Sequence, residues 1–543
     1  MTDNKYMNLP AEKFEFANNS DKLHDAKFSD KPIGYFKDAW LRFRKNKASI
    51  VASIIIICII LFAIIVPFFN QTETGTRLDP YFAKMGPYVP SLAQYGIADG
   101  SAAREPNSKM LIYDYALGIG AQQLTKDPVK FIDAVNAENK YQAVITPIDE
   151  LVASGSRFNT TYQIRMNTYL EKGFVYRDVE KSEYEAILKF QEETGIQVLF
   201  PLIDTLDKSN KEEFTAEDRK TGAHYCFDVN SANYWYKTDS KGTPVDEKGK
   251  AIKFDAADPT SWDFELIPNY MTDENGDLVY YKPMGGGNAD THQYRIRVLY
   301  YNYYNFVNDR EASFLFGTDS QGYDLAYRLA VGIRLSLILA CVVSLINFVI
   351  GAIYGAIEGY YGGTTDIVMQ RISEILGGIP FTVVATLFQM HLATKVGAIP
   401  SLIFAFVMTG WLGTAGLVRT QFYRFKNQEY VMAARTLGAK DWRIIWKHIF
   451  PNSLGTIVTS SVLVIPGVIF SESMLSFLGI VNLGGAKMTS LGTLLSEASN
   501  IWQTYPHLMI FPAIIISLLM ICFNLFGNGL RDAFNPSLRG VED

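Results

Sequence analysis

Six long runs of apolar residues limit what this chain can fold into. The first, Ala48–Phe69, has no charge over about 22 residues, enough for a helix to cross a hydrocarbon core of roughly 30 Å. Five further runs follow in the second half of the chain: Arg334–Tyr360, Leu376–Thr394, Ser401–Phe422, Leu454–Leu478 and His507–Phe526. The sequence therefore predicts a polytopic α-helical membrane protein with six transmembrane helices.

The first run is predicted to be a retained signal anchor. Residues 1–47, which precede it, are hydrophilic, whereas a secretory signal peptide starts its apolar region much sooner. No small-residue cleavage site follows the run.

Residues 70–318, between the first two runs, form a predicted folded insertion. This stretch has no spanning segment and holds 37 acidic and 26 basic residues. Its aromatic and β-branched residues are frequent and patterned, which is not typical of a disordered linker. We expect an α+β domain.

Local signals in the insertion agree with that class. Ser182 and Glu185 predict a capping box for a helix that ends near Gly195. The remaining signals are a strand at Ile196–Ile203, a hairpin turn at Asn275-Gly276 between Phe264–Met271 and Leu278–Lys282, and a strand with alternating residues at Tyr294–Tyr300.

Basic residues indicate which side of the membrane each segment occupies, because cytoplasmic segments are enriched in Lys and Arg. They gather in three places: Lys37, Arg42, Arg44, Lys45 and Lys47 before the first run; Arg424, Lys426, Arg435, Lys440, Arg443 and Lys447 between the fourth and fifth; and Arg531 and Arg539 after the sixth. With six spans these share one side, so both termini are predicted to be cytoplasmic and the insertion extracellular. The predicted layout is therefore a cytoplasmic segment 1–47, a helix 48–69, the insertion 70–318, a five-helix core 319–530 with a basic loop 424–452, and a cytoplasmic tail 531–543.

Several function classes lack their signatures. The sequence has no Gly-x-x-x-x-Gly-Lys-Ser/Thr loop, so we expect no ATP site in this chain. The four cysteines and six histidines show no metal-ligand spacing, and a net charge of −6 does not suggest a nucleic-acid partner. We expect no cofactor or metal here.

The loop 424–452 is the most informative segment. Two short helices are predicted on either side of Gly438, which can adopt the backbone angles of a sharp turn. Ala433 and Ala434 are small enough to let another surface approach, and Pro451 is expected to stop the second helix. On composition alone, this basic hairpin either lies among lipid headgroups or docks into a soluble partner.

The pattern Ala433-Ala434-x-x-x-Gly438, with Pro451 thirteen residues later, resembles the coupling loop of ABC-importer permeases. The family signature starts Glu-Ala-Ala and ends in Leu-Pro, whereas this chain has Met432 and Phe450 at the glutamate and leucine positions. The acidic residue sits three places earlier, at Glu429, as is common in the dipeptide, oligopeptide and nickel branch.

The resemblance extends along much of the chain. As a whole, the chain resembles the C-type oligopeptide permease subunit in its long Gram-positive form. The resemblance rests on Lys37-Asp38-Ala39-Trp40, on Phe316–Leu337 (with Tyr323 where most relatives have arginine), on Gly359–Pro380, on Ser473–Gly479 and on Asn528–Pro536. It does not cover residues 70–313.

This resemblance implies the type I ABC importer permease fold and an ATP-driven import function. It also implies four kinds of partner: a homologous permease subunit, two cytoplasmic ATPase subunits that use ATP and Mg, an extracellular peptide-binding lipoprotein, and the peptide itself. The residues implied to couple to an ATPase are Glu429, Ala433, Ala434, Arg435, Gly438, Trp442, Arg443, His448 and Pro451.

Two charged residues at membrane depth are candidates for the translocation pathway. Placing a charge there costs free energy, so such residues are rare and usually functional. Glu472 in the fifth run could meet the amino end of a peptide, or could be a hydrogen-bonded structural carboxylate. Arg334 begins the second run. Pro466-Gly467, and Gly377-Gly378 before Pro380, predict bends or helix starts.

Three other functions remain open. A permease for nickel or another small solute could use the same scaffold, and a membrane-anchored sensor could use the insertion to bind a ligand. An enzyme is the third, but the sequence offers no nucleophile–base pair, metal set or paired carboxylates.

Overall fold

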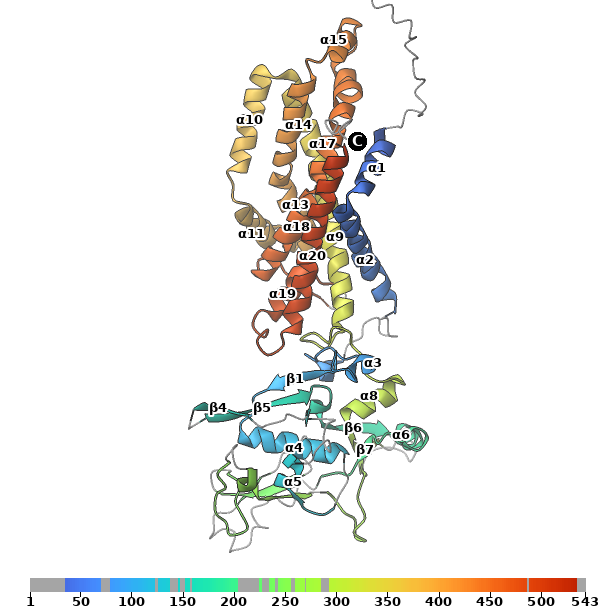
Figure 1. Cartoon of the computed structure of the whole chain (residues 1–543), viewed down its shortest axis with the longest axis vertical. Helices are drawn as coiled ribbons and strands as arrows, with labels where there is room; N and C mark the ends of the chain where they lie inside the picture. Colours follow the sequence, from blue (N-terminus) through green and yellow to red (C-terminus); the bar gives the residue numbers. More distant parts are fainter. Residues whose placement is uncertain are drawn as a thin grey trace, which may run out of the picture.

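A computed structural model describes residues 35–534, with gaps at 70–78, 123–125, 137–144, 147–151, 157–158, 204–223, 227–233, 240–242, 255–258, 269, 285–292 and 486–487. Most of the predicted N-terminal segment and tail therefore lie outside the described residues. The chain is elongated, with a helical bundle at one end and a mixed α+β domain at the other (Figure 1). The α+β domain lies between α2 (Lys47–Phe69) and α9 (Leu325–Tyr361), so the predicted fold class is confirmed.

Helices long and apolar enough to cross a membrane make up the bundle. Among the described residues there are five, or six if one bent pair counts as a single span. They are α2, α9, α13 (Ala398–Gly410) with α14 (Leu412–Phe425), the helix Asp441–Phe477, α20 (His507–Phe534), and the bent pair α10 (Gly363–Gly377) with α11 (Phe381–His391).

The predicted third span, Leu376–Thr394, is wrong as a single straight helix. α10 and α11 meet at an angle of 71°, and the break falls at Gly378–Pro380. Pro380 has no N–H to donate into a preceding turn, and it disfavours helical angles at Ile379. The prediction of a bend at Gly377-Gly378 and Pro380 is confirmed, and Pro466 likewise lies in the first turn of α18 (Val464–Phe477).

Close packing of α9 against α14 organises the bundle. Gly351, Gly355 and Gly359 repeat every four residues along α9, and an added Cβ at any of them would overlap α14. Small residues at this spacing let two helix backbones approach, which is how helices associate in membranes.

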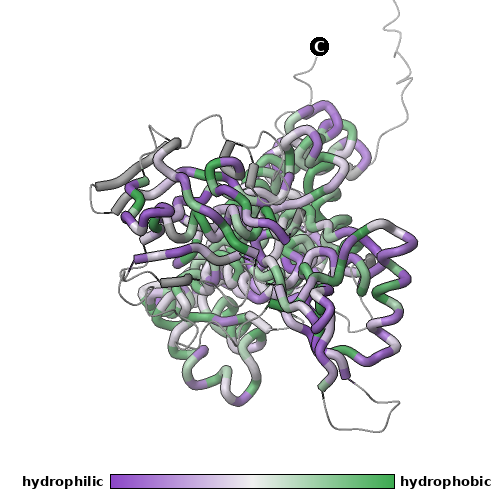
Figure 2. Tube along the Cα trace, turned by 90° about the horizontal axis from the view of Figure 1, so that it is seen from below, coloured by the Kyte–Doolittle hydropathy of each residue, from purple (hydrophilic) through white to green (hydrophobic). Residues whose placement is uncertain are grey.

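Among its described residues, the α+β domain contains three four-stranded antiparallel sheets. The first contains β1 (Ser101–Arg104), β3 (Ile145–Thr146), β4 (Val152–Ser156) and β5 (Asn159–Asn167). The second contains β2 (Val129–Lys130), β8 (His224–Cys226), β9 (Tyr234–Thr238) and β10 (Glu265–Pro268), and the third contains β6 (Phe174–Glu180), β7 (Leu199–Phe200), β11 (Tyr281–Met284) and β12 (Gln293–Leu299). Hydrophobic and hydrophilic residues alternate over short distances when the molecule is viewed from this end (Figure 2).

Four helices of the described residues pack against these sheets: α4 (Ser108–Gln122), α5 (Phe131–Asn136), α6 (Lys181–Thr194) and α8 (Tyr300–Asn308). The short α3 (Pro90–Ala93) precedes β1. The main core packs α4 and α5 against aromatic residues such as Trp262, which is 1 % exposed.

The local predictions were partly right. α6 ends at Gly195, which is left-handed at φ 73°, as predicted. The capping box is wrong, because α6 begins at Lys181 and places Ser182 inside its first turn. The predicted strand at Ile196–Ile203 is reduced to β7, and β12 confirms the alternating strand. The predicted hairpin at Asn275-Gly276 is present over a short length, because Thr272 bridges Leu278 and the Val279 N–H donates to the Met271 carbonyl at 3.0 Å. The strands further out, β10 and β11, pair with other strands.

Candidate functional site: a helical elbow and buried polar centres

A sharp helical elbow forms the tip of the bundle farthest from the α+β domain (Figure 1). We define the elbow as residues 429–443, which hold α15 (Glu429–Thr436) and the short α16 (Asp441–Arg443). Between them Gly438 has a φ of 81°, and its N–H donates to the Arg435 carbonyl at 3.0 Å. A side chain at that φ would be strained, so the predicted two helices separated by Gly438 are confirmed.

The elbow is fixed to the bundle by buried apolar contacts. Val431 and Ile444 are fully buried and pack in one cluster with Val418 and Phe422 of α14. The Tyr360 hydroxyl, at the end of α9, donates to Asp441 Oδ1 at 2.6 Å. These contacts hold the elbow in one orientation relative to α9 and α14.

Its outer surface is apolar and open to solvent. Leu437 is 87 % exposed, Trp442 65 % and Met432 51 %. Arg443 and Lys440 are exposed beside them. An apolar patch bordered by positive charge is typical of a protein interaction site.

A continuous helix of 37 residues, Asp441–Phe477, leads from the elbow into the bundle. It consists of α16, a π-helical segment η6 (Ile444–Ile449), α17 (Phe450–Val462) and α18. The prediction that Pro451 stops the second helix is wrong, because Pro451 lies in the first turn of α17, where its missing N–H removes little. A movement of the elbow can therefore be carried directly to α18.

The structure brings most of the predicted coupling residues together on the elbow. Exposed there are Glu429, Ala433, Arg435, Gly438, Trp442 and Arg443, with Ala434 half-buried. His448 and Pro451 lie further along the Asp441–Phe477 helix, where the Asn452 amide donates to the His448 carbonyl at 2.7 Å.

Glu472, the first pathway candidate, is fully buried inside the chain. The hydroxyl of Ser476 donates to its Oε1 at 2.9 Å, and that of Ser336 donates to its Oε2 at 3.0 Å. Both carboxylate oxygens are hydrogen-bonded, one to a serine of α9 and the other to a serine of α18. This geometry supports the structural alternative. The second candidate, Arg334, lies two residues before Ser336 and is exposed on α9, away from Glu472.

Sequence reasoning did not assign a role to Arg328, which is 2 % exposed at the start of α9. Its Nε lies 3.1 Å from Asp319 Oδ2, its Nη2 lies 3.8 Å from Glu497, and its Nη1 donates to the Gly485 carbonyl at 2.7 Å. The guanidinium also lies 5.1 Å from the centre of the Tyr323 ring. Arg328 therefore joins α9 to α19 (Leu491–Ala498) and the loop before it.

A second centre joins the opposite end of α9 to α10 and α14. Arg419 Nε lies 2.6 Å from Asp366 and 3.3 Å from Glu358, and the Tyr423 hydroxyl donates to Asp366 at 2.7 Å. The sequence signals for this centre are Arg419 and Glu358, two charged residues within long apolar segments. The sequence does not show that they are close together, because they lie far apart along the chain.

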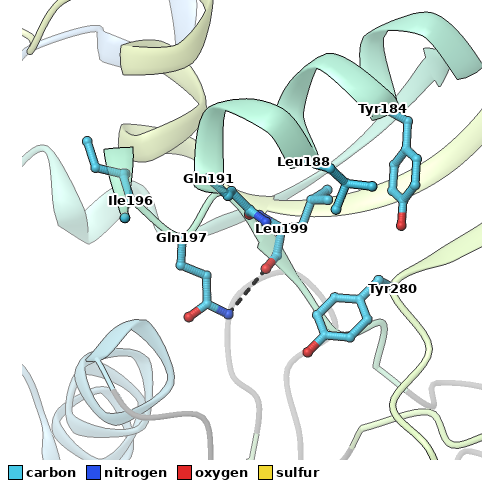
Figure 3. A pocket seen from close by; sticks show the side chains of 8 residues that line it. Tyr184, Leu188, Gln191, Ile196, Gln197, Leu199 and Tyr280 are labelled. Atoms are coloured by element: carbon cyan, nitrogen blue, oxygen red, sulfur yellow. Dashed lines mark hydrogen bonds between the residues drawn. The ribbon is translucent and has the colours of Figure 1, made fainter. Parts of the chain in front are cut away.

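A shallow groove lies on the α+β domain at the end of α6 (Figure 3). Tyr184, Leu188 and Tyr280 line it, and the Gln197 amide donates to the Leu199 carbonyl at 3.3 Å. The backbone N–H groups of Val198 and Leu199 donate to Gln191. These polar groups are used to hold the turn after α6 in place.

Two protein-family models match the chain. Residues 351–540 match the binding-protein-dependent transport system inner membrane component, and residues 34–87 match the N-terminal transmembrane domain of oligopeptide transport permease C. Neither covers residues 88–350, which include most of the α+β domain.

Curated relatives agree with these matches. The oligopeptide transport system permease protein OppC of Bacillus subtilis is 41 % identical over 224 residues, 41 % of this chain and 72 % of that protein. The dipeptide transport system permease protein DppC of the same organism is 42 % identical over 230 residues, 41 % of this chain and 69 % of that protein. OppC of Escherichia coli is 41 % identical over 232 residues, 42 % of this chain and 75 % of that protein.

Among solved structures, a chain of the inward-facing MetNI methionine ABC transporter matches with a TM-score of 0.34 and 17 % identity, over 39 % of this chain and 98 % of that one. A chain of an amino acid ABC transporter with histidines matches with a TM-score of 0.29 and 16 % identity, over 36 % and 89 %.

Proposed function

Since this chain belongs to the family of binding-protein-dependent transport system inner membrane components, we propose that it is a transmembrane subunit of an ATP-driven oligopeptide importer. The OppC and DppC relatives, at about 41 % identity over most of their length, support an oligopeptide or dipeptide substrate. The subunit forms half of the translocation pathway and carries out no covalent chemistry on the peptide.

The elbow is the observation that carries this proposal. Its exposed Leu437 and Trp442 form a surface for a separate ATPase subunit, which binds the ATP and Mg that this chain has no loop to hold. Two such ATPases would serve the importer, one on each permease subunit. When ATP binding closes them, the elbow moves with its ATPase and shifts the helix Asp441–Phe477, which changes the side to which the pathway opens.

The arrangement of the bundle supports a cytoplasmic elbow. The start of α1 (Tyr35–Lys45) and the end of α20 lie toward the elbow, and the α+β domain lies at the opposite end (Figure 1). If the basic segments lie on the cytoplasmic side of a bacterial plasma membrane, both termini are cytoplasmic and the α+β domain is extracellular. A homologous permease subunit would complete the pathway on the other side.

We propose that the α+β domain helps to dock or seal the extracellular peptide-binding lipoprotein over the outer mouth. Its first residues form hydrogen bonds with the segment that leads into α9, so the domain lies directly against the end of the bundle opposite the elbow (Figure 1). Replacing residues 73–310 with a short linker should impair peptide uptake and leave the ATPases bound. Full uptake by this deletion would disprove the docking role.

Affinity purification in mild detergent, followed by mass spectrometry, tests the proposal as a whole. We expect two ATPases and a second permease to be recovered with the wild-type chain. Leu437→Asp should lose the ATPases and keep the second permease, because it places a charge in the docking patch. Ile97→Asp is the control, since Ile97 is 61 % exposed in the α+β domain. If Leu437→Asp retains the ATPases in full, the elbow is not their docking site.

Two alternatives have distinct outcomes. A permease for nickel or another small solute would recover the same partners, but would transport that solute rather than peptides in a panel of uptake assays. A membrane-anchored ligand sensor would recover no ATPase at all.

A further inference from the structure

An apolar groove lies between α1, α2 and α20, on the outside of the bundle. Trp40 and Phe43 of α1, Ile54 and Ile57 of α2, and Phe526 of α20 line most of it. Its volume is about 430 Å³, and Ile54, Ile57 and Trp40 are each more than half exposed. This groove is separate from the elbow and from the buried polar centres.

The walls of the groove are held in place. Phe43 packs edge-on against Phe526 with ring centroids 5.5 Å apart, and Trp40 stacks on Phe43 at 5.9 Å. Below them the Ser49 hydroxyl donates to the Leu525 carbonyl at 3.0 Å. A Cβ at Gly529 would overlap Ser49, so α2 and α20 are in close contact at this level. The groove is therefore a fixed feature of the fold.

Cations lie next to the groove on the two helices α1 and α2. Lys37, Trp40 and Arg44 share one face of α1, at spacings of three and four residues, and all three are exposed. Lys47 lies on the same face of α2 as Ile54 and Ile57, at spacings of seven and ten. The only acidic residue in α1, Asp38, is bound to Arg42 at 2.8 Å. At the nearby end of α20, Arg531 and Asp532 carry opposite charges, so the residues of α1 and the start of α2 leave an excess of positive charge at this end of the groove.

We propose that this groove is a binding site for one anionic phospholipid. The acyl chain lies along Ile54, Ile57 and Phe526, and the phosphate is bound by Arg44 and Lys47. Clusters of Lys and Arg next to a transmembrane helix attract anionic headgroups, and Trp at the same level is typical of the membrane interface. An apolar groove that ends next to positive charges is complementary to an anionic phospholipid. A zwitterionic lipid or a neutral helix would leave these positive charges uncompensated.

Photocrosslinking tests which molecule fills the groove. The assembled importer would carry p-benzoylphenylalanine at position 54, in nanodiscs of equal phosphatidylglycerol and phosphatidylcholine. We expect adducts with the mass of phosphatidylglycerol, in excess over phosphatidylcholine. A control probe at Leu345, which is 64 % exposed on α9, should show no headgroup preference. Crosslinking mainly to another protein subunit, or equal labelling by the two lipids, would overturn the proposal.

A second measurement tests the proposed headgroup contacts. Arg44→Gln and Lys47→Gln should each lower the preference for phosphatidylglycerol by about fivefold, because a cation near an anionic surface contributes about 1 kcal/mol. Lys395→Gln is the matched control, since Lys395 is exposed on α12 (Ala393–Val396), a helix that does not line the groove. A preference that survives both groove substitutions would also overturn the proposal. Recovery of the partner subunits with each variant shows that it still folds and assembles.

Discussion

Thr318 and Met85, 233 residues apart in the sequence, are joined by two hydrogen bonds. The Met85 N–H donates to Thr318 Oγ1 at 2.8 Å, and the Thr318 N–H donates to the Met85 carbonyl at 3.0 Å. The Thr318 hydroxyl in turn donates to the Phe82 carbonyl. Thr318 is fully buried, so these bonds fix the start of the α+β domain to the segment that leads into α9.

Thr318→Val should loosen this junction. It leaves the Met85 N–H without its acceptor inside the protein, at a cost of about 1–3 kcal/mol. We expect faster hydrogen exchange at residues 82–88, with little change along α14. Thr318→Ser keeps the hydroxyl and should resemble the wild type. Equal exchange in the Val and Ser variants would show that the hydroxyl is not what holds the junction.

Glu472 distinguishes a structural role from a pathway role. Glu472→Gln keeps one acceptor oxygen for Ser336 or Ser476, whereas Glu472→Leu removes both. If the role is structural, thermal stability should fall more in the Leu variant, by about 1–3 kcal/mol, and the Gln variant should transport peptides at a near-normal KM. A large rise in KM for Glu472→Gln with unchanged stability would favour contact with the amino end of the peptide.

The sequence predicted five of the spans in their order, because the backbone of an uncharged run in lipid can satisfy its hydrogen bonds by forming a helix. It did not predict which prolines interrupt a helix and which ones a helix continues past. Leu376–Thr394 reads as one apolar run, but Pro380 breaks it, while Pro451 was expected to break a helix and does not. The difference lies in position, since Pro451 sits at a first turn next to a π-helical segment, and the sequence does not show that segment.

The candidate site was predicted only where its residues are near one another in the sequence. The elbow spans 429–443, and its spacing of small residues and Gly438 is visible directly. Arg419 and Asp366 are 53 residues apart, and nothing local says that they form a pair. Such contacts depend on how α9, α10 and α14 pack, which a single sequence does not specify.

Gly438→Pro should uncouple ATP hydrolysis from transport. Proline fixes φ near −65°, whereas Gly438 adopts 81°, and the substitution also removes the N–H bond to the Arg435 carbonyl. We expect normal insertion into the membrane, continued ATP hydrolysis and lost uptake in proteoliposomes. Gly438→Asn is the control, because Asn tolerates positive φ and no atom lies within 4 Å of an added Cβ. Normal transport by the Pro variant would argue against a lever role.

Asp114 should make the α+β domain less stable as pH rises. Burial, together with the nearby charge of Glu171, raises the pKa of Asp114 from 3.8 to about 7. Between these values the folded state holds a proton that the unfolded state releases, so stability is greatest below pH 4 for this group and declines up to about pH 7. Asp114→Asn should remove this decline, as measured by hydrogen exchange of α4 corrected for intrinsic rates. An unchanged pH profile in the Asn variant would assign the decline to another group.

Arg328→Met should be among the most destabilising substitutions in the bundle. It leaves the buried Asp319 without its cation, and breaking a buried pair costs about 3–5 kcal/mol. Burial already raises the pKa of Asp319, and Arg328 opposes that effect. Without Arg328 the carboxyl should take up a proton more readily, so the loss of stability should be smaller at pH 5 than at pH 8. Thermal unfolding of Arg328→Met, Asp319→Asn and the double variant checks this: the double variant should be more stable than the sum of the two single losses predicts. Additive losses would mean that Arg328 acts mainly through Gly485 and Glu497 instead.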